Sequence, residues 1–310
     1  MPAGNPNFEA LLAGVLSHDN TVRKNAESIY NQELETQPAV IVGQLLRCLA
    51  SGQAELSRTT CAVLIRRVVM PSGPHWPRLD ATVKAAIRAG LLSAVGSEPS
   101  NPVARKICHA VAASASPDAG PWPELLPAVV HMAKSAEQHK RTLAFFLLGA
   151  TAEISLESLS GQASSLMQVC ADALSDLSQL ATASAAFKAA ASVLQTIVDQ
   201  TEQSAFHAII PQMLQVLSAV LSAGEELEAQ EMLESLIQLS DVSPLFFRTY
   251  VVPMSEAMLA VGSAPLLEFC TCQWRGGSSQ PRRARTRDHA KEPLPRTWLA
   301  TPRSGVDVRD

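Results

Sequence analysis

The sequence is poor in aromatic residues and lacks the short motifs that mark common enzyme families. Aromatic residues make up 5% of its 310 positions although hydrophobic residues make up 47%, so the apolar content is mostly Ala, Leu and Val. This composition favours closely packed helices over strands. The sequence contains no glycine-rich phosphate loop, no H-E-x-x-H, no G-x-S-x-G and no cysteine pairs at zinc spacing. We therefore expect an all-α protein without catalytic residues, metal sites or cofactors.

The cysteines also show no sign of a functional site. Six cysteines are scattered along the chain with no signal peptide before them, which indicates a reducing compartment. Cys61, Cys108 and Cys170 lie among Ala, Val and Ile, where a free cysteine behaves as a small buried apolar residue. Cys270 and Cys272 form only a C-x-C. We therefore expect core packing rather than metal binding from these thiols.

Two other features resemble functional elements and are better explained by structure. His131 and His139 have acidic neighbours, but two histidines on a helical hairpin are more often exposed polar residues than a catalytic pair. The segment Gln203–Gly224 contains no charged residue, yet it includes three Gln and Pro211. A bilayer span needs about 20 predominantly apolar residues, so this segment predicts a helix buried between helices and no membrane insertion.

Apolar residues spaced three and four apart predict a series of helical hairpins. Short polar or glycine-containing segments separate the helices and predict tight antiparallel connections. A seventh hairpin is expected to begin at Pro244. The six predicted pairs are residues 8–16 with 22–30, 40–49 with 56–69, 83–95 with 103–113, 125–133 with 141–154, 166–177 with 186–198, and 206–221 with 228–239.

A short pattern recurs at the start of several second helices. It begins with "DNTVRKNAE" (Asp19–Glu27) and places a basic residue three before an Ala or Cys, as do Arg23, Arg58, Arg105 and Arg141. These arginines are separated by 35, 47 and 36 residues, close to the period of roughly 40 to 47 residues of HEAT and armadillo units. Because one hairpin cannot bury its apolar face alone, the pattern predicts a right-handed α-solenoid of about six to seven HEAT-type hairpins over residues 1–269.

The recurring residues have a structural explanation. A carboxylate at a helix start and the following Arg are expected to form charge-assisted hydrogen bonds from one repeat to the next. A role for these arginines in ligand binding is the alternative. The small residues Ala26, Cys61, Cys108 and Ala144 are expected to face inward, where two helices approach closely and a larger side chain would cause strain.

Charge is distributed unevenly along the chain. Residues 1–149 carry 14 basic and 11 acidic residues, residues 150–270 carry 2 and 14, and residues 271–310 carry 9 and 4. The middle block is too acidic for a nucleic-acid groove, which needs a basic surface. It predicts either a solvated face or an acidic inner surface that binds Lys- and Arg-rich cargo. The candidate cargo-binding residues are Glu225, Glu226, Glu228, Glu231 and Glu234.

Several segments resemble stretches of one known protein family. "PWPELLPAVV" (121–130) is similar to the "WP-x-LLP" opening of the fourth repeat in that family, and "RTTCAVLIRRVV" (58–69) resembles a repeat-two helix that ends in a basic pair. "ATVKAAIRAGLL" (81–92) and "EMLESLIQLSDVSPLFFRTYV" (231–251) resemble later segments in the same order. The family is that of the karyopherin-β nuclear transport receptors, in particular the importin-β3 (importin 5) subfamily, and the resemblance covers roughly residues 8–269.

The resemblance implies a receptor that shuttles between cytoplasm and nucleus. Its N-terminal repeats would bind the GTP-bound GTPase Ran, its outer helices would bind phenylalanine-glycine (FG) repeats of nucleoporins, and its inner face would hold basic import signals. The candidate Ran-binding residues are Arg66, Arg67, Arg105 and Lys106. For Arg66 and Arg67 the alternative is that both are solvated or bond neighbouring carbonyl groups.

The sequence departs from such receptors in two respects. They have about twenty repeats, whereas this chain has six or seven. From residue 270 onward the chain loses helical periodicity and gains Gly, Pro and Arg, a composition typical of disorder. We expect a product of altered splicing or of a mistaken gene model, and a basic arm is the alternative. A HEAT-repeat scaffold of an unrelated assembly, without Ran binding, is therefore the alternative function.

Two local expectations concern the packing of the repeats. Trp122, between Pro121 and Pro123, is expected to pack at the start of repeat four. Terminal repeats need a polar outer face. Because the tail offers charge in place of an apolar stripe, we expect the last apolar face to be exposed, around Phe246, Phe247, Met254 and Leu259.

Overall fold

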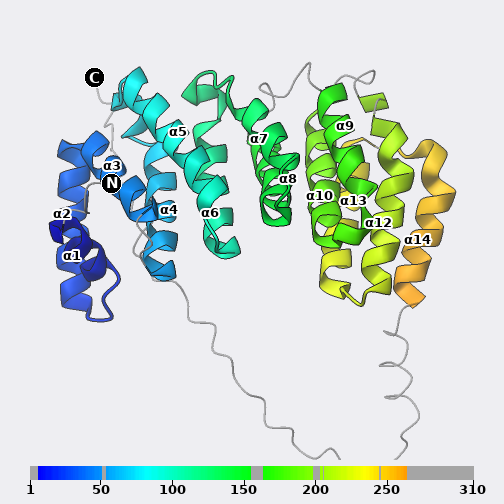
Figure 1. Cartoon of the computed structure of the whole chain (residues 1–310), viewed down its shortest axis with the longest axis horizontal. Coiled ribbons are helices and arrows are strands. Elements are labelled where there is room, and N and C mark those ends of the chain that lie inside the picture. Colours follow the sequence, from blue (N-terminus) through cyan, green and yellow to red (C-terminus); the bar gives the residue numbers. More distant parts are fainter. Residues whose placement is uncertain are drawn as a thin grey trace, which may run out of the picture. The chain divides into compact units, whose positions relative to one another are not determined.

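The computed structural model of the chain describes residues 6–50, 54–154, 163–197, 203–204, 206–243 and 246–263. Within these ranges the chain forms thirteen α-helices and no strands (Figure 1). The all-α prediction is therefore confirmed. The helices are α1 (Pro6–Val15), α2 (Asn20–Thr36), α3 (Pro38–Ala50), α4 (Glu55–Val69), α5 (Ala81–Ser97), α6 (Asn101–Ser114), α7 (Leu125–Ala133), α8 (Gln138–Ala152), α9 (Ala163–Leu174), α10 (Leu180–Thr196), α12 (Ile210–Ser222), α13 (Glu226–Val242) and α14 (Val251–Ser263).

The helices pair into stacked hairpins, as the periodicity predicts. Six pairs pack against each other, namely α1 with α2, α3 with α4, α5 with α6, α7 with α8, α9 with α10, and α12 with α13. The second helices also contact one another in order, from α4 through α6, α8 and α10 to α13. We call these five helices the second-helix layer. In the other layer α3 contacts α5, and α9 contacts α12. The fold is an α-solenoid.

The predicted helix boundaries are wrong by several residues in hairpins five and six. α10 begins at Leu180, six residues before the expected start at Ala186. Residues Phe206–Ile209 form a separate 3₁₀ turn, and α12 begins after it. Pro211 occupies the first turn of α12, where its missing N–H leaves no hydrogen bond unmade.

Contacts divide the chain into two units, Met1–Gly262 and Ser263–Asp310. The expected boundary near residue 270, the basic tail that follows it, Cys270 and Cys272 all lie outside the described residues, as does Pro244. The first unit is described below. In the part of the chain that the structure describes, no helix is long and apolar enough to cross a membrane.

The small residues of the recurring pattern are buried, as predicted. Cys61, Cys108 and Ala144 are fully inaccessible and Ala26 is 6% exposed. At Ala26, α1 and α2 approach so closely that a Cβ added to Gly14 would lie 2.9 Å from the Ala26 Cβ. A larger side chain there would have to displace α1 from α2. The small residues therefore set the distance between the helices.

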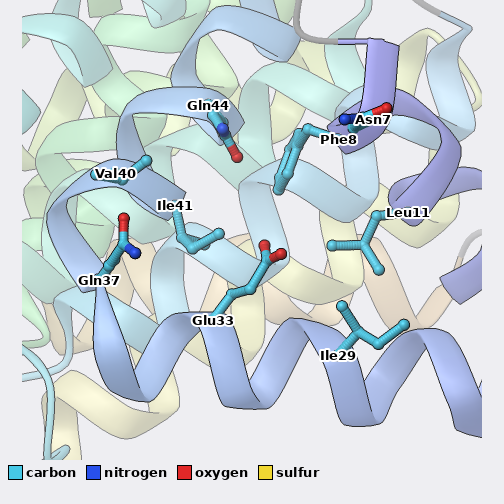
Figure 2. Close-up of a pocket in the computed structure, with 9 residues that line it drawn as sticks. All are labelled: Asn7, Phe8, Leu11, Ile29, Glu33, Gln37, Val40, Ile41 and Gln44. Carbon is cyan, nitrogen blue, oxygen red and sulfur yellow. The ribbon is translucent and has the colours of Figure 1, made fainter.

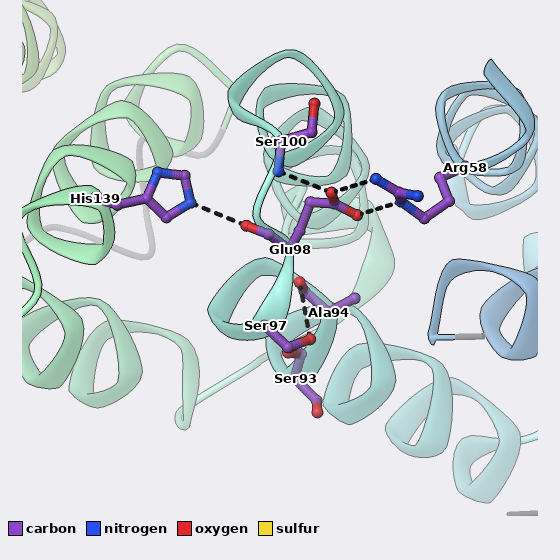
Figure 3. A network of polar contacts seen from close by, with 7 residues as sticks. All are labelled: Arg58, Ser93, Ala94, Ser97, Glu98, Ser100 and His139. Carbon is purple, nitrogen blue, oxygen red and sulfur yellow. Dashed lines mark hydrogen bonds and ion pairs between the residues drawn. The ribbon is translucent and has the colours of Figure 1, made fainter. Parts of the chain in front are cut away.

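One recurring arginine forms the predicted bridge between repeats. The Arg58 guanidinium donates to both carboxylate oxygens of Glu98, at 2.9 and 3.0 Å (Figure 3). The same carboxylate accepts the backbone N–H of Ser100, and its side chain is only 3% exposed. His139 Nε2 lies 2.9 Å from the Glu98 carbonyl oxygen. His139 is therefore a half-buried link between hairpins three and four, whereas His131 is exposed as expected.

The other arginines depart from the expected ladder. Arg141 donates to the Ser135 carbonyl oxygen at 2.7 Å and to the side-chain oxygen of Gln179 at 2.6 Å, so its partner in the next hairpin is an amide. Arg23 bonds groups of its own hairpin, including the Ser17 carbonyl oxygen at 3.2 Å. Arg105 takes no part in such a bridge among the described residues; its guanidinium lies over the Phe146 ring of α8 instead, 5.1 Å from the ring centroid.

A buried arginine that the sequence analysis does not single out joins hairpins three and four. Arg88 on α5 is 8% exposed, and its guanidinium lies 5.7 Å from the Trp76 ring centroid and 5.0 Å from that of Trp122. It donates hydrogen bonds of 2.8 to 3.2 Å to four backbone carbonyl groups. Those carbonyl groups belong to Ser114, Ala119, Gly120 and Pro121. Trp122 packs on the core as predicted, although its ring is only half-buried.

The expectation of an exposed last apolar face is wrong for three of its four residues. Phe246 and Phe247 are each 5% exposed and Met254 is 7% exposed, whereas Leu259 is 72% exposed. The Phe246 ring lies 4.5 Å from the ring of His207, so the aromatic side chains turn back toward hairpin six.

Candidate functional site

A groove crosses the second-helix layer between α6 and α13. Its volume is about 660 Å³. The middle of the groove is formed by α8 and α10, where small residues such as Gly149, Ala185 and Ala189 leave space. The aromatic ring of Phe146 lies beside them. The lining residues that the two flanking helices contribute are charged or polar, so the groove has distinct walls.

One wall of the groove is acidic. Glu225, Glu228 and Glu231, at the start of α13, line it. The Lys188 ammonium on α10 lies 2.8 Å from a carboxylate oxygen of Glu228 and 2.8 Å from one of Glu231. Ser184 also donates a hydrogen bond to Glu228. The structure therefore brings three of the five predicted cargo-binding glutamates together, with a cation already between two of them.

The Glu228 carboxyl group is held in its charged form. Burial opposes ionisation, but hydrogen bonds from Lys188 and Ser184 outweigh it, with help from the positive charges of Lys188 and Arg105. The pKa of the Glu228 carboxyl group therefore lies below its ordinary value.

The other two predicted glutamates do not line the groove. Glu226 and Glu234 are exposed, and Glu234 accepts a hydrogen bond of 3.0 Å from the Gln230 side chain. Past Glu231 the lining of α13 continues with Ser235 and Gln238, four and seven residues further on, and not with Glu234.

Three of the four predicted Ran-binding residues gather around His109. Arg66, Arg105 and Lys106 are exposed, and their positive charges all act on the half-buried imidazole. Burial, and then these three charges, lower the pKa of His109 below its ordinary value. We call Arg66, Arg105, Lys106 and His109 the basic cluster; it spans α4 and α6. Arg67 lies outside it, where its charge acts on Tyr30 of α2 instead.

Arg105 belongs to the basic cluster and to the groove at once. Its guanidinium lies 5.1 Å from the centroid of the Phe146 ring, and His109 meets the same ring edge-on at 5.3 Å. Both residues line the groove opposite the glutamates of α13. The groove therefore has a basic wall on α6 and an acidic wall on α13.

A second pocket lies among α1, α2 and α3, with a volume of about 490 Å³. Figure 2 shows Phe8, Leu11 and Ile29 around it, with Glu33 and Gln44 directed into it. The Gln44 side-chain oxygen is buried and has no hydrogen-bond partner among the residues that the structure describes. This pocket offers apolar walls, a carboxylate and an unsatisfied amide oxygen.

Sequence reasoning missed three residues that shape these surfaces. Lys188 is one of two basic residues between positions 150 and 270, and this rarity was a signal that it neutralises part of the acidic block. His109 and Phe146 have no local signal, because their importance comes from helices that meet only in the folded chain. Among the described residues, no group of three or more His, Cys, Asp or Glu could hold a metal ion.

The chain is an α-solenoid whose stacked hairpins expose a charged groove, which is typical of solenoid proteins that bind partners. The family described as IPO5-like, TPR repeats matches residues 99–257, which is just over half of the chain. The chain belongs to this importin-5-like family of karyopherins. The resemblance found in the sequence is therefore confirmed.

Individual relatives agree with the family assignment. The chain is 26% identical to a probable importin-5 homolog of Dictyostelium discoideum, over 77% of this chain and 23% of that protein. It is 25% identical to importin subunit beta-3 of Saccharomyces cerevisiae, over 75% of this chain and 22% of that protein. The chain therefore spans about a quarter of the length of the relatives it matches.

Solved structures share the fold. The crystal structure of Kap121p superimposes with a TM-score of 0.73 at 23% identity, covering 85% of this chain and 25% of Kap121p. Kap121p has also been solved bound to RanGTP, and that structure superimposes with a TM-score of 0.66 at 23% identity, over 79% of this chain and 23% of Kap121p.

Proposed function

We propose that the chain acts as the N-terminal portion of a nuclear import receptor that shuttles between cytoplasm and nucleus. Membership of the importin-5-like family and the fold shared with Kap121p support this function. The observation that carries it furthest is the basic cluster on α4 and α6, because it gathers residues that the family resemblance assigns to Ran.

In the proposed function, Ran-GTP binds the N-terminal repeats through Arg66, Arg105 and Lys106. These three side chains are exposed and all of their charges act on His109, which suits an acidic patch on a partner. Arg67, which lies toward Tyr30, contributes less. The Kap121p structure with RanGTP supports the choice of partner.

A pull-down with Ran in its two nucleotide states tests this function. The receptor hypothesis predicts retention of Ran-GTP and little retention of Ran-GDP. The alternative, a HEAT-repeat scaffold of an unrelated assembly, predicts no dependence on the nucleotide.

A double substitution of Arg66 and Lys106 by Ala tests the residues themselves. Loss of two exposed charges should weaken Ran-GTP binding by roughly tenfold or more, since one charge-assisted hydrogen bond contributes about 1.5 to 3 kcal/mol. The matched control is Arg67→Ala, which removes a neighbouring charge outside the basic cluster. Equal binding by all these variants would count against the assignment.

We further propose that basic cargo binds the acidic wall and that nucleoporin FG repeats bind the layer of first helices. Glu225, Glu228 and Glu231 support the cargo surface.

The pocket among α1, α2 and α3 supports the binding of FG repeats, because its apolar walls suit a phenylalanine side chain. Leu11→Glu should abolish capture of an FG-repeat peptide if this pocket is used, and Leu177→Glu, an exposed control outside it, should not.

A further inference from the structure

The two walls of the groove carry opposite charges and face one another across α8 and α10. Arg105 and His109 stand on α6, and Glu225, Glu228 and Glu231 stand on α13. The charge of Arg105 reaches Glu228, where it helps to lower the pKa of that carboxyl group. A ligand that lies in the groove therefore meets both signs of charge along its length.

The acidic wall is already partly neutralised from within. Lys188 lies between Glu228 and Glu231 at 2.8 Å from each, so those two carboxylates have a partner before any ligand arrives. Glu225 and Glu153, which also line the groove, have no ion-pair partner among the described residues. A purely polybasic segment would meet Arg105 and Lys188 as like charges, which disfavours it.

The basic wall holds a cation that has no carboxylate partner in the described part of the chain. The Arg105 guanidinium carbon lies over the Phe146 ring, 5.1 Å from its centroid, and a cation–π contact of this kind does not occupy the N–H donors of the guanidinium. A planar carboxylate is the ligand that such a fork fits best. Between the walls, Gly149, Ala185 and Ala189 leave room for small or apolar side chains.

We propose that this groove binds an extended partner segment of mixed charge. A carboxylate side chain of the segment pairs with Arg105, a Lys or Arg side chain pairs with Glu225, and small or apolar residues between them lie over α8 and α10. This inference rests on the proposed receptor function and changes its ligand class, from purely basic cargo to a segment that carries both signs. It also assigns Arg105 to the groove rather than to Ran alone.

Selection from a random library of 12-residue peptides displayed on phage tests the proposal on the full chain. The unaltered chain should enrich peptides that carry both acidic and basic residues. Arg105→Gln should lose the acidic enrichment alone, and Glu225→Gln should lose the basic enrichment alone. Lys134→Gln is the matched control, because it removes an exposed positive charge that belongs neither to the groove nor to the basic cluster.

Titration calorimetry with the most enriched peptide completes the test. Replacing the acidic residue of the peptide by Gln should weaken binding to the unaltered chain about tenfold and leave binding to Arg105→Gln unchanged. Enrichment of purely basic peptides, indifferent to Arg105→Gln, would overturn the mixed-charge groove and leave the receptor function standing. Absence of any enrichment would overturn the groove as a docking site. Nucleotide-dependent Ran binding by the same preparation then decides the receptor function separately.

Discussion

Hairpins three and four are held together by a buried guanidinium, whereas α8 and α10 of hairpins four and five meet through small side chains, with a hydrogen bond from Arg141 to Gln179 beside them. At the first junction Arg88 bonds four backbone carbonyl groups between two tryptophan rings. At the second, Gly149 of α8 faces Ala189 of α10, and a Cβ on that glycine would lie 3.5 Å from the Ala189 Cα. The same helical unit is therefore joined in two different ways.

The two halves of the chain also differ in how they use charged side chains. In the first half of the chain, Arg58, Arg88 and Arg141 bond groups within the fold, so only some cations remain for partners. In the second half, α8 and α10 meet through small residues, and Lys188 of α10 pairs with Glu228 and Glu231 of the next hairpin.

Removing the guanidinium at the first junction should have the largest effect. Arg88→Met leaves several carbonyl groups without their donors, and breaking a buried charged contact typically costs about 3 to 5 kcal/mol. The free energy of unfolding, measured by chemical denaturation, should fall by that amount. Arg66→Met, at an exposed position, should change it by less than about 0.5 kcal/mol. A similar small effect for both variants would remove the distinction between the junctions.

Truncating the ring that stacks on Arg88 should have a smaller effect. Burial of a whole tryptophan is worth about 3 to 5 kcal/mol, and because Trp122 is only half-buried we expect Trp122→Ala to cost about 2 to 3 kcal/mol. Trp122→Phe keeps an aromatic face and should cost less. An unchanged melting temperature for Trp122→Ala would show that the ring contributes nothing to the join.

At the second junction two substitutions of one glycine should differ in sign. Gly149→Ala fits at ordinary contact distance and should stabilise the helix by up to about 1 kcal/mol. Gly149→Leu overfills the contact with α10 and should cost about 1 to 3 kcal/mol. Thermal unfolding of both variants measures the difference. Equal tolerance of Leu and Ala would mean that close approach does not hold this junction.

The smallest expected effect is the pH dependence from His109. Its pKa is lowered in the folded state, so the unfolded chain binds more protons as the pH falls below about 6.5, and stability should decrease there. Partial exposure limits the loss to less than about 1 kcal/mol. His109→Gln should flatten the dependence between pH 5 and 7, as the exposed control His131→Gln should not. If the free energy of unfolding of His109→Gln depends on pH as it does in the unaltered chain, another group causes the dependence.

Much of the fold follows from local pattern. The apolar spacing of three and four predicts the paired helices, and Asp19 caps α2 by accepting the N–H groups of Thr21 and Val22, at 2.7 and 3.1 Å. Cys61, Cys108 and Ala144 are buried where the repeating pattern places them. These features depend on neighbours within one or two turns or on a constant period, so the sequence alone determines them.

The binding surfaces depend on contacts that have no local signal. The sequence groups Arg105 with Arg58 and Arg141, but in the folded chain its side chain lies over Phe146 of the next hairpin. Lys188 meets Glu228 and Glu231 only because α10 packs beside α13. The sequence by itself determined the helices, their pairing and the sign of charge in each block. Only the tertiary structure decided which charges meet, because charges far apart in sequence interact once packing brings their helices together.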